Sequence, residues 1–371
     1  MILGGGEGTR LRPLTLTSPK PLLPIANQPF LDRQLSWLGS HGIDEVVLSL
    51  GYLPHAFAEH FPEGTYRGIR LRYAVEDRPL GTAGGIRFAA EGFEDRFVVC
   101  NGDVLTALDL TAMIEFHDAN RAEATICLSR VDDPSAFGVV PTRDDGEVVG
   151  FIEKPPPGAA PTDWINAGTY VLEPAVLERI PPRLNVSIER ETFPRMVETR
   201  RALYAYPSDA YWLDIGTAEK YLEAHADALA GRLGSPPAPG AREMAPGVWV
   251  QGEVSIDATA RFDGPSLIGT GCSVARGAVL AGAVLGAHSA IGRDAVVERS
   301  ILLAGARIGA GSLVRDSVVG TGAVLEAGVV VSDQTVVGAA ARIAASTRIS
   351  GGRVPPGEPM DAGSIVEAAN H

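Results

Sequence analysis

The chain has 371 residues, which is long for a single hydrophobic core and favours two domains. Hydrophobic residues make up 45% of the chain and charged residues 21%, a balance typical of a folded globular protein rather than a disordered one. The net charge of −13 argues against nucleic acid or an anionic membrane surface as a partner, and the sequence has no apolar run long enough to span a membrane.

The cysteines and lysines are few. Cys100, Cys127 and Cys272 form an odd, scattered set without metal-ligand spacing, which predicts a cytoplasmic protein without a disulfide framework. Only three of the 32 basic residues are lysines. Lys20 and Lys154 each precede a proline, and a compact ammonium differs from a guanidinium in shape and hydration. We therefore single out these two lysines as candidate site residues.

Residues 1–230 alternate strand and helix patterns. We expect strands at Met1–Leu3, Glu45–Leu50, Ile69–Val75, Arg96–Cys100 and Ala124–Val131. We expect helices at Phe30–Ser40, Ala56–Phe61, Thr82–Ala90 and Leu110–Ala119. The alternation predicts an α/β domain with a Rossmann-like, doubly wound, mostly parallel sheet. Shorter strands within 137–154 and 165–172 predict an inserted lobe.

The composition of residues 231–247 predicts a linker, and the chain beyond them has a different pattern of apolar residues. Aliphatic residues recur about every six positions in 248–350, with occasional five-residue steps, as in the run Val297, Leu303, Ile308. Such hexapeptide repeats predict a left-handed parallel β-helix, with a tail at 351–371. We expect this element to pack the chain into a homo-oligomer.

Two loops stand where ligands bind in open α/β sheets, at the carboxyl ends of strands. One is the glycine-rich run after Leu3, and the other is Asn101-Gly102-Asp103. Glycines after a strand let backbone N–H groups approach an anion, although a plain tight turn has the same composition. The glycine spacing matches neither the P-loop nor the dinucleotide-binding fingerprint.

The opening loop, Gly5-Gly6-Glu7-Gly8-Thr9-Arg10-Leu11 followed by Pro19-Lys20-Pro21-Leu22, resembles the signature of the sugar-phosphate nucleotidyltransferases. Further motifs continue the resemblance in order: Leu80-Gly81-Thr82-Ala83-Gly84, Asn101-Gly102-Asp103, Phe137-Gly138-Val139, Phe151-Ile152-Glu153-Lys154-Pro155, Asn166-Ala167-Gly168, Ser187-Ile188-Glu189 and Trp212-Leu213-Asp214-Ile215-Gly216. Over essentially its full length the chain is most similar to the mannose-1-phosphate guanylyltransferases of this family.

The resemblance implies an enzyme that joins a nucleoside triphosphate to a sugar 1-phosphate and releases pyrophosphate, with Mg²⁺ as cofactor. It implies a catalytic set of Arg10, Lys20, Asp103, Lys154 and Asp214, of which Asp103 and Asp214 would hold the metal. The implied nucleotide-binding residues are Leu3, Gly5, Gly6, Gly8, Thr9, Glu76, Gly81 and Thr82. The implied sugar-phosphate-binding residues are Gly138, Glu153, Lys154, Asn166 and Gly168. Lys220 is interpreted as a solvated helix residue.

Glu76 favours guanine as the base. One carboxylate can accept from the two neighbouring donors on guanine's pairing edge, whereas thymine and uracil offer one donor between two acceptors. The favoured reaction is therefore transfer of GMP from GTP to mannose 1-phosphate. Guanylyl transfer to heptose 1-phosphate and thymidylyl transfer to glucose 1-phosphate stay open.

Two other functions are also open. A regulatory relative would bind nucleotide sugars without catalysis, but such proteins tend to lose the cations and carboxylates that this chain keeps. An acyltransferase built on the β-helix would need a catalytic histidine, and here the tail offers only His288 and His371.

Overall fold

The computed structural model describes residues 1–199 and 202–367 and divides into two units. The first unit comprises Met1–Glu7 and Leu31–Asp214, and the second comprises Gly8–Phe30 and Ile215–His371. Residues 200–201 of the predicted catalytic domain and 368–371 of the predicted tail, including His371, lie outside the described residues.

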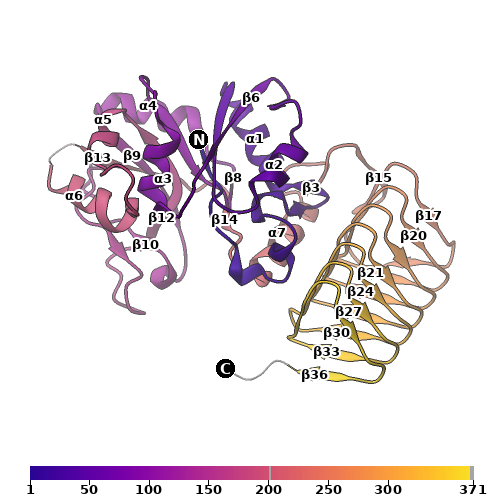
Figure 1. Ribbon diagram of the computed structural model, residues 1–371. Coiled ribbons are helices and arrows are strands. Elements are labelled where there is room, and N and C mark those ends of the chain that lie inside the picture. Colours follow the sequence, from indigo (N-terminus) through magenta and orange to yellow (C-terminus); the bar gives the residue numbers. More distant parts are fainter. Residues whose placement is uncertain (200–201, 368–371) are drawn as a thin grey trace. The chain divides into compact units, whose positions relative to one another are not determined.

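A mixed sheet forms the centre of the first unit (Figure 1). Its main path runs β11-β10-β12-β7-β1-β4-β6-β5, and β9 joins β12 to β13. The strands are β1 (Ile2–Leu3), β4 (Glu45–Leu50), β5 (Thr65–Tyr66), β6 (Ile69–Val75), β7 (Phe97–Asn101), β9 (Ala124–Arg130), β10 (Gly138–Val139), β11 (Ile152–Glu153), β12 (Trp164–Leu172) and β13 (Leu203–Pro207). The neighbours β7, β1, β4 and β6 are parallel, as the alternating pattern predicts.

Seven α-helices occur in the described residues. They are α1 (Phe30–Ser40), α2 (Pro54–His60), α3 (Gly81–Ala89), α4 (Leu110–Asn120), α5 (Ala175–Glu178), α6 (Phe193–Val197) and α7 (Ala218–Leu229). In α1 the apolar positions Leu31, Leu35 and Leu38 are fully buried, because their spacing puts them on one face of the helix. Asp109 caps α4 by accepting a hydrogen bond from the Ala112 N–H at 3.0 Å.

The second unit contains a β-solenoid with three sheets, drawn from orange to yellow in Figure 1. Its strands are parallel except the first, Ala241–Ala245, which is antiparallel to its neighbour. One sheet is β15 (Ala241–Ala245), β16 (Val248–Gln251), β19 (Ser266–Ile268), β22 (Val284–Leu285), β25 (Ile301–Leu302), β28 (Val318–Val319), β31 (Val336–Val337) and β34 (Arg353–Val354). The next is β17 (Ser255–Ile256), β20 (Ser273–Val274), β23 (Ala290–Ile291), β26 (Arg307–Ile308), β29 (Val324–Leu325), β32 (Arg342–Ile343) and β35 (Pro359–Met360). The third is β18 (Arg261–Phe262), β21 (Val279–Ala281), β24 (Val296–Glu298), β27 (Leu313–Arg315), β30 (Val330–Ser332), β33 (Arg348–Ser350) and β36 (Ile365–Glu367).

The stacking of the coils explains the five-residue steps in the repeat. Val274 pairs with Ile291, and Ile291 pairs with Ile308, so each of these coils takes 17 residues, or two hexads and one pentad. Ile256 pairs with Val274, so that coil takes 18 residues, or three hexads. One position was predicted wrongly: Leu302, not Leu303, lies in the stacked core, opposite Val319. Both residues are aliphatic, so the hydrophobic pattern could not show whether the five-residue step comes before Leu302 or after Leu303. The left hand of the helix and its role in oligomer formation stay predictions.

Two further expectations concern disulfide bonds and membrane-spanning helices. Cys100, Cys127 and Cys272 are free and buried. Among the helices of the described residues, none combines the length and the apolar character that crossing a membrane demands. Cytoplasmic location stays a prediction.

Candidate functional site

The four parallel strands of the first unit end at one edge of the sheet, and predicted site residues follow three of them. Gly5 follows β1, Glu76 follows β6, and Asp103 follows β7. The backbone of β1 is fixed on both sides, because Leu3 pairs with Ser49 of β4 and with Asn101 of β7. This edge is where open α/β sheets bind ligands.

A close backbone approach holds this edge together. The Gly102 N–H donates to the Leu3 carbonyl at 2.8 Å, and a Cβ on Gly102 would lie 2.5 Å from the same oxygen. A side chain does not fit there unless the backbone moves. Gly5 and Gly6 are exposed just beyond Leu3.

The remaining part of the glycine-rich loop belongs to the second unit. Gly8 has φ of 61°, and its carbonyl accepts from Thr15 Oγ1 at 2.9 Å. A Cβ on Gly8 would lie 3.3 Å from the Lys20 Cβ, so the aliphatic stem of Lys20 lies beside the loop. The Arg10 guanidinium lies close against Gly216, where a Cβ would be 2.6 Å from Arg10 Nη2. Thr9 begins the short 3₁₀ turn that carries Arg10.

The two predicted metal ligands lie at the same end of a two-stranded ladder. β8 (Val104–Thr106) pairs antiparallel with β14 (Trp212–Asp214), and Asp214 lies opposite Val104, the residue after Asp103. Both aspartates are half-buried. The described residues contain no group of three or more His, Cys, Asp or Glu side chains that could hold a metal. The pair fits Mg²⁺, which usually takes one or two carboxylates and completes its shell with water and substrate phosphates.

The Glu76 carboxylate is held in one orientation. Its Oε1 accepts from Ser49 Oγ at 3.2 Å, and its Oε2 accepts from the Leu80 N–H at 3.0 Å. Gly85 of α3 makes room for it, since a Cβ there would lie 2.6 Å from Glu76 Oε1. Each carboxylate oxygen can accept more than one hydrogen bond, so capacity for a base remains.

Gly81 and Thr82 begin α3 and are held by a distant segment. Gly81 has φ of 70°, and a Cβ there would lie 2.6 Å from the Val186 carbonyl. Thr82 Oγ1 donates to Glu189 Oε2 at 2.7 Å and accepts from the Ile188 N–H at 2.8 Å. The Thr82 hydroxyl is therefore directed at the Ser187-Ile188-Glu189 motif.

A small hairpin presents the predicted sugar-phosphate residues. Gly138 of β10 pairs with Glu153 of β11, and a Cβ on Gly138 would lie 2.7 Å from the Phe151 ring. The Lys154 N–H donates to the Phe137 carbonyl at 2.9 Å. Lys154 has φ of 50°, a left-handed conformation that costs a side-chain-bearing residue about 1–2 kcal/mol. The hairpin fixes this backbone while the Lys154 side chain is exposed.

The Asn166-Ala167-Gly168 motif lies within β12, where the pairing with β9 is irregular, and it connects the hairpin to the aspartate ladder. The Gly168 N–H donates to Asn166 Oδ1 at 3.0 Å, and a Cβ on Gly168 would lie 2.6 Å from Asn101 Nδ2. Trp212 Nε1 donates to the Ala167 carbonyl at 2.9 Å. Motifs spread over more than a hundred residues of sequence thus meet in the first unit.

Three side chains that support this site were not among the predicted site residues. Ser49 holds Glu76, while Glu189 and Tyr170 connect Thr82 to Asn166. Glu189 was visible as part of a family motif, but without a role. Nothing in the sequence pattern distinguishes Tyr170 from any other residue of a buried strand. Burial raises the pKa of the Tyr170 phenol well above its ordinary value, and the nearby Glu189 carboxylate adds to this shift.

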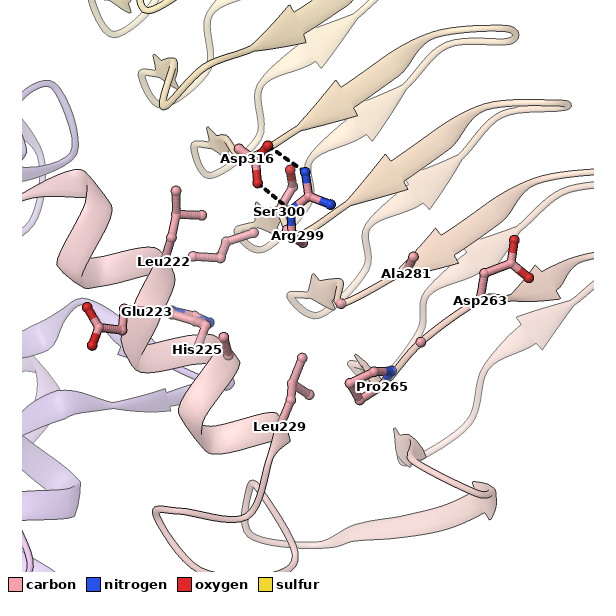
Figure 2. Close-up of a pocket in the computed structure, with 14 residues that line it drawn as sticks. Leu222, Glu223, His225, Leu229, Asp263, Pro265, Ala281, Arg299, Ser300 and Asp316 are labelled. Carbon is pink, nitrogen blue, oxygen red and sulfur yellow. Dashed lines mark hydrogen bonds and ion pairs between the residues drawn. The ribbon is translucent and has the colours of Figure 1, made fainter. Parts of the chain in front are cut away.

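The second unit holds a separate cavity of about 480 Å³ (Figure 2). It is lined by apolar side chains of α7, such as Leu222 and Leu229, and by coils of the solenoid. Arg299 is the cation at its margin, and its Nε and Nη2 donate to the two carboxylate oxygens of Asp316 at 2.6 and 2.7 Å. Because this guanidinium is already neutralised, the cavity is poorly suited to a phosphate group.

Comparison with known proteins gives two family matches. A model described as nucleotidyl transferase matches residues 1–231, and one described as the GMPPB C-terminal domain matches residues 250–364.

The chain is also similar to named relatives and to a solved structure. The mannose-1-phosphate guanylyltransferase of Mycobacterium tuberculosis is 42% identical over 77% of this chain and 79% of that protein. The UTP–glucose-1-phosphate uridylyltransferase of Synechocystis is 33% identical, over 77% and 82% respectively. The crystal structure of HddC from Yersinia pseudotuberculosis complexed with GMP-PN has a TM-score of 0.52 and 32% identity, over 60% of this chain and 96% of that one.

Proposed function

The chain belongs to the nucleotidyl transferase family, and from this membership we propose that it transfers GMP from GTP to mannose 1-phosphate, forming GDP-mannose and pyrophosphate. The observation that carries the proposal is the meeting of the motifs in the first unit. Asn101 lies against Gly168, Trp212 donates to Ala167, and Asp214 lies beside the strand that begins after Asp103. The name of the 42% identical relative and the GMP-PN complex of HddC support guanine and mannose as the substrate pair.

In the proposed reaction an oxygen of the sugar phosphate attacks the α-phosphorus of GTP. A new P–O bond forms while the bond to the pyrophosphate oxygen breaks, and the departing pyrophosphate takes up negative charge. Positioning and charge stabilisation carry such a reaction. Arg10 would neutralise the triphosphate and the developing pyrophosphate, Lys20 would contact the α-phosphate, and Lys154 would bind the sugar phosphate.

The other proposed residues bind and orient. Backbone N–H groups of the loop after Leu3 (Gly5, Gly6, Gly8 and Thr9) would cradle the phosphates, and Glu76 with Gly81 and Thr82 would bind the base. Gly138, Glu153, Asn166 and Gly168 would contact the sugar. We propose Asp103 and Asp214 as the Mg²⁺ ligands; the bound ion would offset phosphate charge that a protein of net charge −13 otherwise repels.

The test measures pyrophosphate release with Mg²⁺, crossing GTP, dTTP, UTP and ATP with mannose, glucose and heptose 1-phosphates. We expect release with GTP and mannose 1-phosphate, and its loss on addition of EDTA with recovery when Mg²⁺ is restored. A preference for UTP and glucose 1-phosphate, the pair in the name of the Synechocystis relative, would overturn the proposed substrates and leave the reaction class standing. No release from folded protein in any combination would overturn the reaction itself.

A further inference from the structure

The carboxylate of Glu189 lies between two parts of the proposed site. Its Oε2 accepts from Thr82 Oγ1 at 2.7 Å and from Ser187 Oγ at 2.8 Å. Its Oε1 accepts from the Tyr170 hydroxyl at 3.4 Å. Glu189 belongs to the π-helical turn Ile188–Thr192 and is only half-buried, so it bridges segments rather than filling the core.

The contact with Tyr170 determines how Asn166 is oriented. Tyr170 is fully buried and its phenol stays protonated, so its proton goes to Glu189 and its oxygen is left to accept. Asn166 Nδ2 donates to that oxygen at 2.9 Å, and Asn166 Oδ1 accepts from the Gly168 N–H at 3.0 Å. The amide group therefore has one permitted orientation, and one N–H and one lone pair remain for a ligand.

The contact between Glu189 and Thr82 fixes the start of α3, which belongs to the nucleotide end of the proposed site. The Thr82 hydroxyl donates to Glu189 and accepts from the Ile188 N–H, so it ties the start of α3 to the turn that carries Glu189. Gly81, the preceding residue, is packed against the Val186 carbonyl of the same segment.

We propose that Glu189 is a positioning residue, which orients the sugar-contacting amide of Asn166 through Tyr170 and anchors the nucleotide-binding start of α3 through Thr82. The inference rests on the proposed function. It assigns a role to a carboxylate outside the proposed substrate contacts, and it joins the nucleotide and sugar ends of the proposed site in one hydrogen-bonded chain.

The experiment compares steady-state constants of the full chain with GTP, mannose 1-phosphate and Mg²⁺ for four variants. Tyr170→Phe removes the hydroxyl that links Glu189 to Asn166. We expect its KM for mannose 1-phosphate to rise about tenfold while its KM for GTP stays unchanged. Thr82→Val is expected to raise the KM for GTP and to leave the KM for mannose 1-phosphate unchanged. Glu189→Gln is expected to raise both KM values. Ser187→Ala is the matched control, because Ser187 donates to the same carboxylate oxygen but leads to neither substrate.

The outcomes separate positioning from structural support. A purely structural role predicts lower thermal midpoints in all four variants with both KM values unchanged, and that result would overturn the inference. Asn166→Ala tests the proposed sugar contact directly. If Asn166→Ala raises the KM for mannose 1-phosphate and Tyr170→Phe does not, the inference alone fails. If Asn166→Ala leaves that KM unchanged while the unmodified chain turns over, the proposed function stands and the inference fails. If the unmodified chain does not turn over, the proposed function fails and the inference with it.

Discussion

At the residue scale, Glu76 is the residue proposed to select the base. Ser49 and the Leu80 N–H already hold its carboxylate, so Glu76→Gln can fold with its amide N–H toward the Ser49 oxygen and its carbonyl toward Leu80. The variant loses a charged acceptor for guanine, and a hydrogen bond to a charged group contributes about 1.5–3 kcal/mol. We expect kcat/KM for GTP to fall about 10- to 100-fold.

The neighbouring Asp77 provides the control for this variant. It is exposed, and Asp77→Asn makes the same charge change one residue further along the chain. We expect it to leave kcat/KM for GTP unchanged. Equal effects of the two variants would mean that local charge, and not a base contact, sets the preference.

At the element scale, the solenoid depends on close approach between coils. A Cβ on Gly309 would lie 2.5 Å from the Glu326 carbonyl oxygen and 2.6 Å from the Ala327 nitrogen, both backbone atoms of the next coil. Because paired coils on either side prevent that backbone from moving, we expect Gly309→Ala to destabilise the chain by about 1–3 kcal/mol. Urea unfolding followed by circular dichroism measures this change.

Gly311 serves as the comparison two residues away. It has φ of 65° but nothing within 4 Å of a Cβ, and asparagine tolerates this conformation. Gly311→Asn should therefore shift the urea midpoint much less than Gly309→Ala. Equal shifts would show that coil spacing is not what requires glycine at position 309.

The sequence could predict most elements and some of the site. Helix α1 and strands β4 and β6 have the predicted bounds, because their apolar spacing is regular over many residues. The hydrogen bonds from Thr82 and Tyr170 to Glu189 could not be predicted, because they depend on three segments that folding brings together. These segments are the start of α3, the strand β12 and the turn at Ser187. The core position of Leu302 escaped prediction because Leu303 satisfies the same pattern.

At the scale of the whole molecule, stability should depend on pH through His117. Its Nδ1 lies 2.8 Å from Thr125 Oγ1 and its Nε2 lies 3.2 Å from Glu173 Oε1, while Arg96 pairs with both Glu173 and Asp118. Burial lowers the pKa of His117 below its ordinary value. The folded state therefore favours the neutral imidazole, and this contribution is complete above about pH 6.5 and is lost as the pH falls.

We accordingly expect the thermal midpoint to fall between pH 7 and pH 5, and to fall less in His117→Gln than in the unmodified chain. His55→Gln, at an exposed position of α2, is the control and should keep the original slope. Parallel slopes for the unmodified chain and His117→Gln would contradict the assignment.

The division of the chain into units has a consequence for the order of events during synthesis. Residues 8–30 belong with residues 215–371, and Tyr221 and His225 of α7 contact the Pro24 carbonyl at 2.6 and 3.0 Å. Those partners leave the ribosome 197 and 201 residues after Pro24. At about 5–20 residues per second, residues 8–30 wait on the order of 10–40 s for the helix that contacts Pro24. The contacts that hold Pro24 therefore form only after a long stretch of chain has followed it.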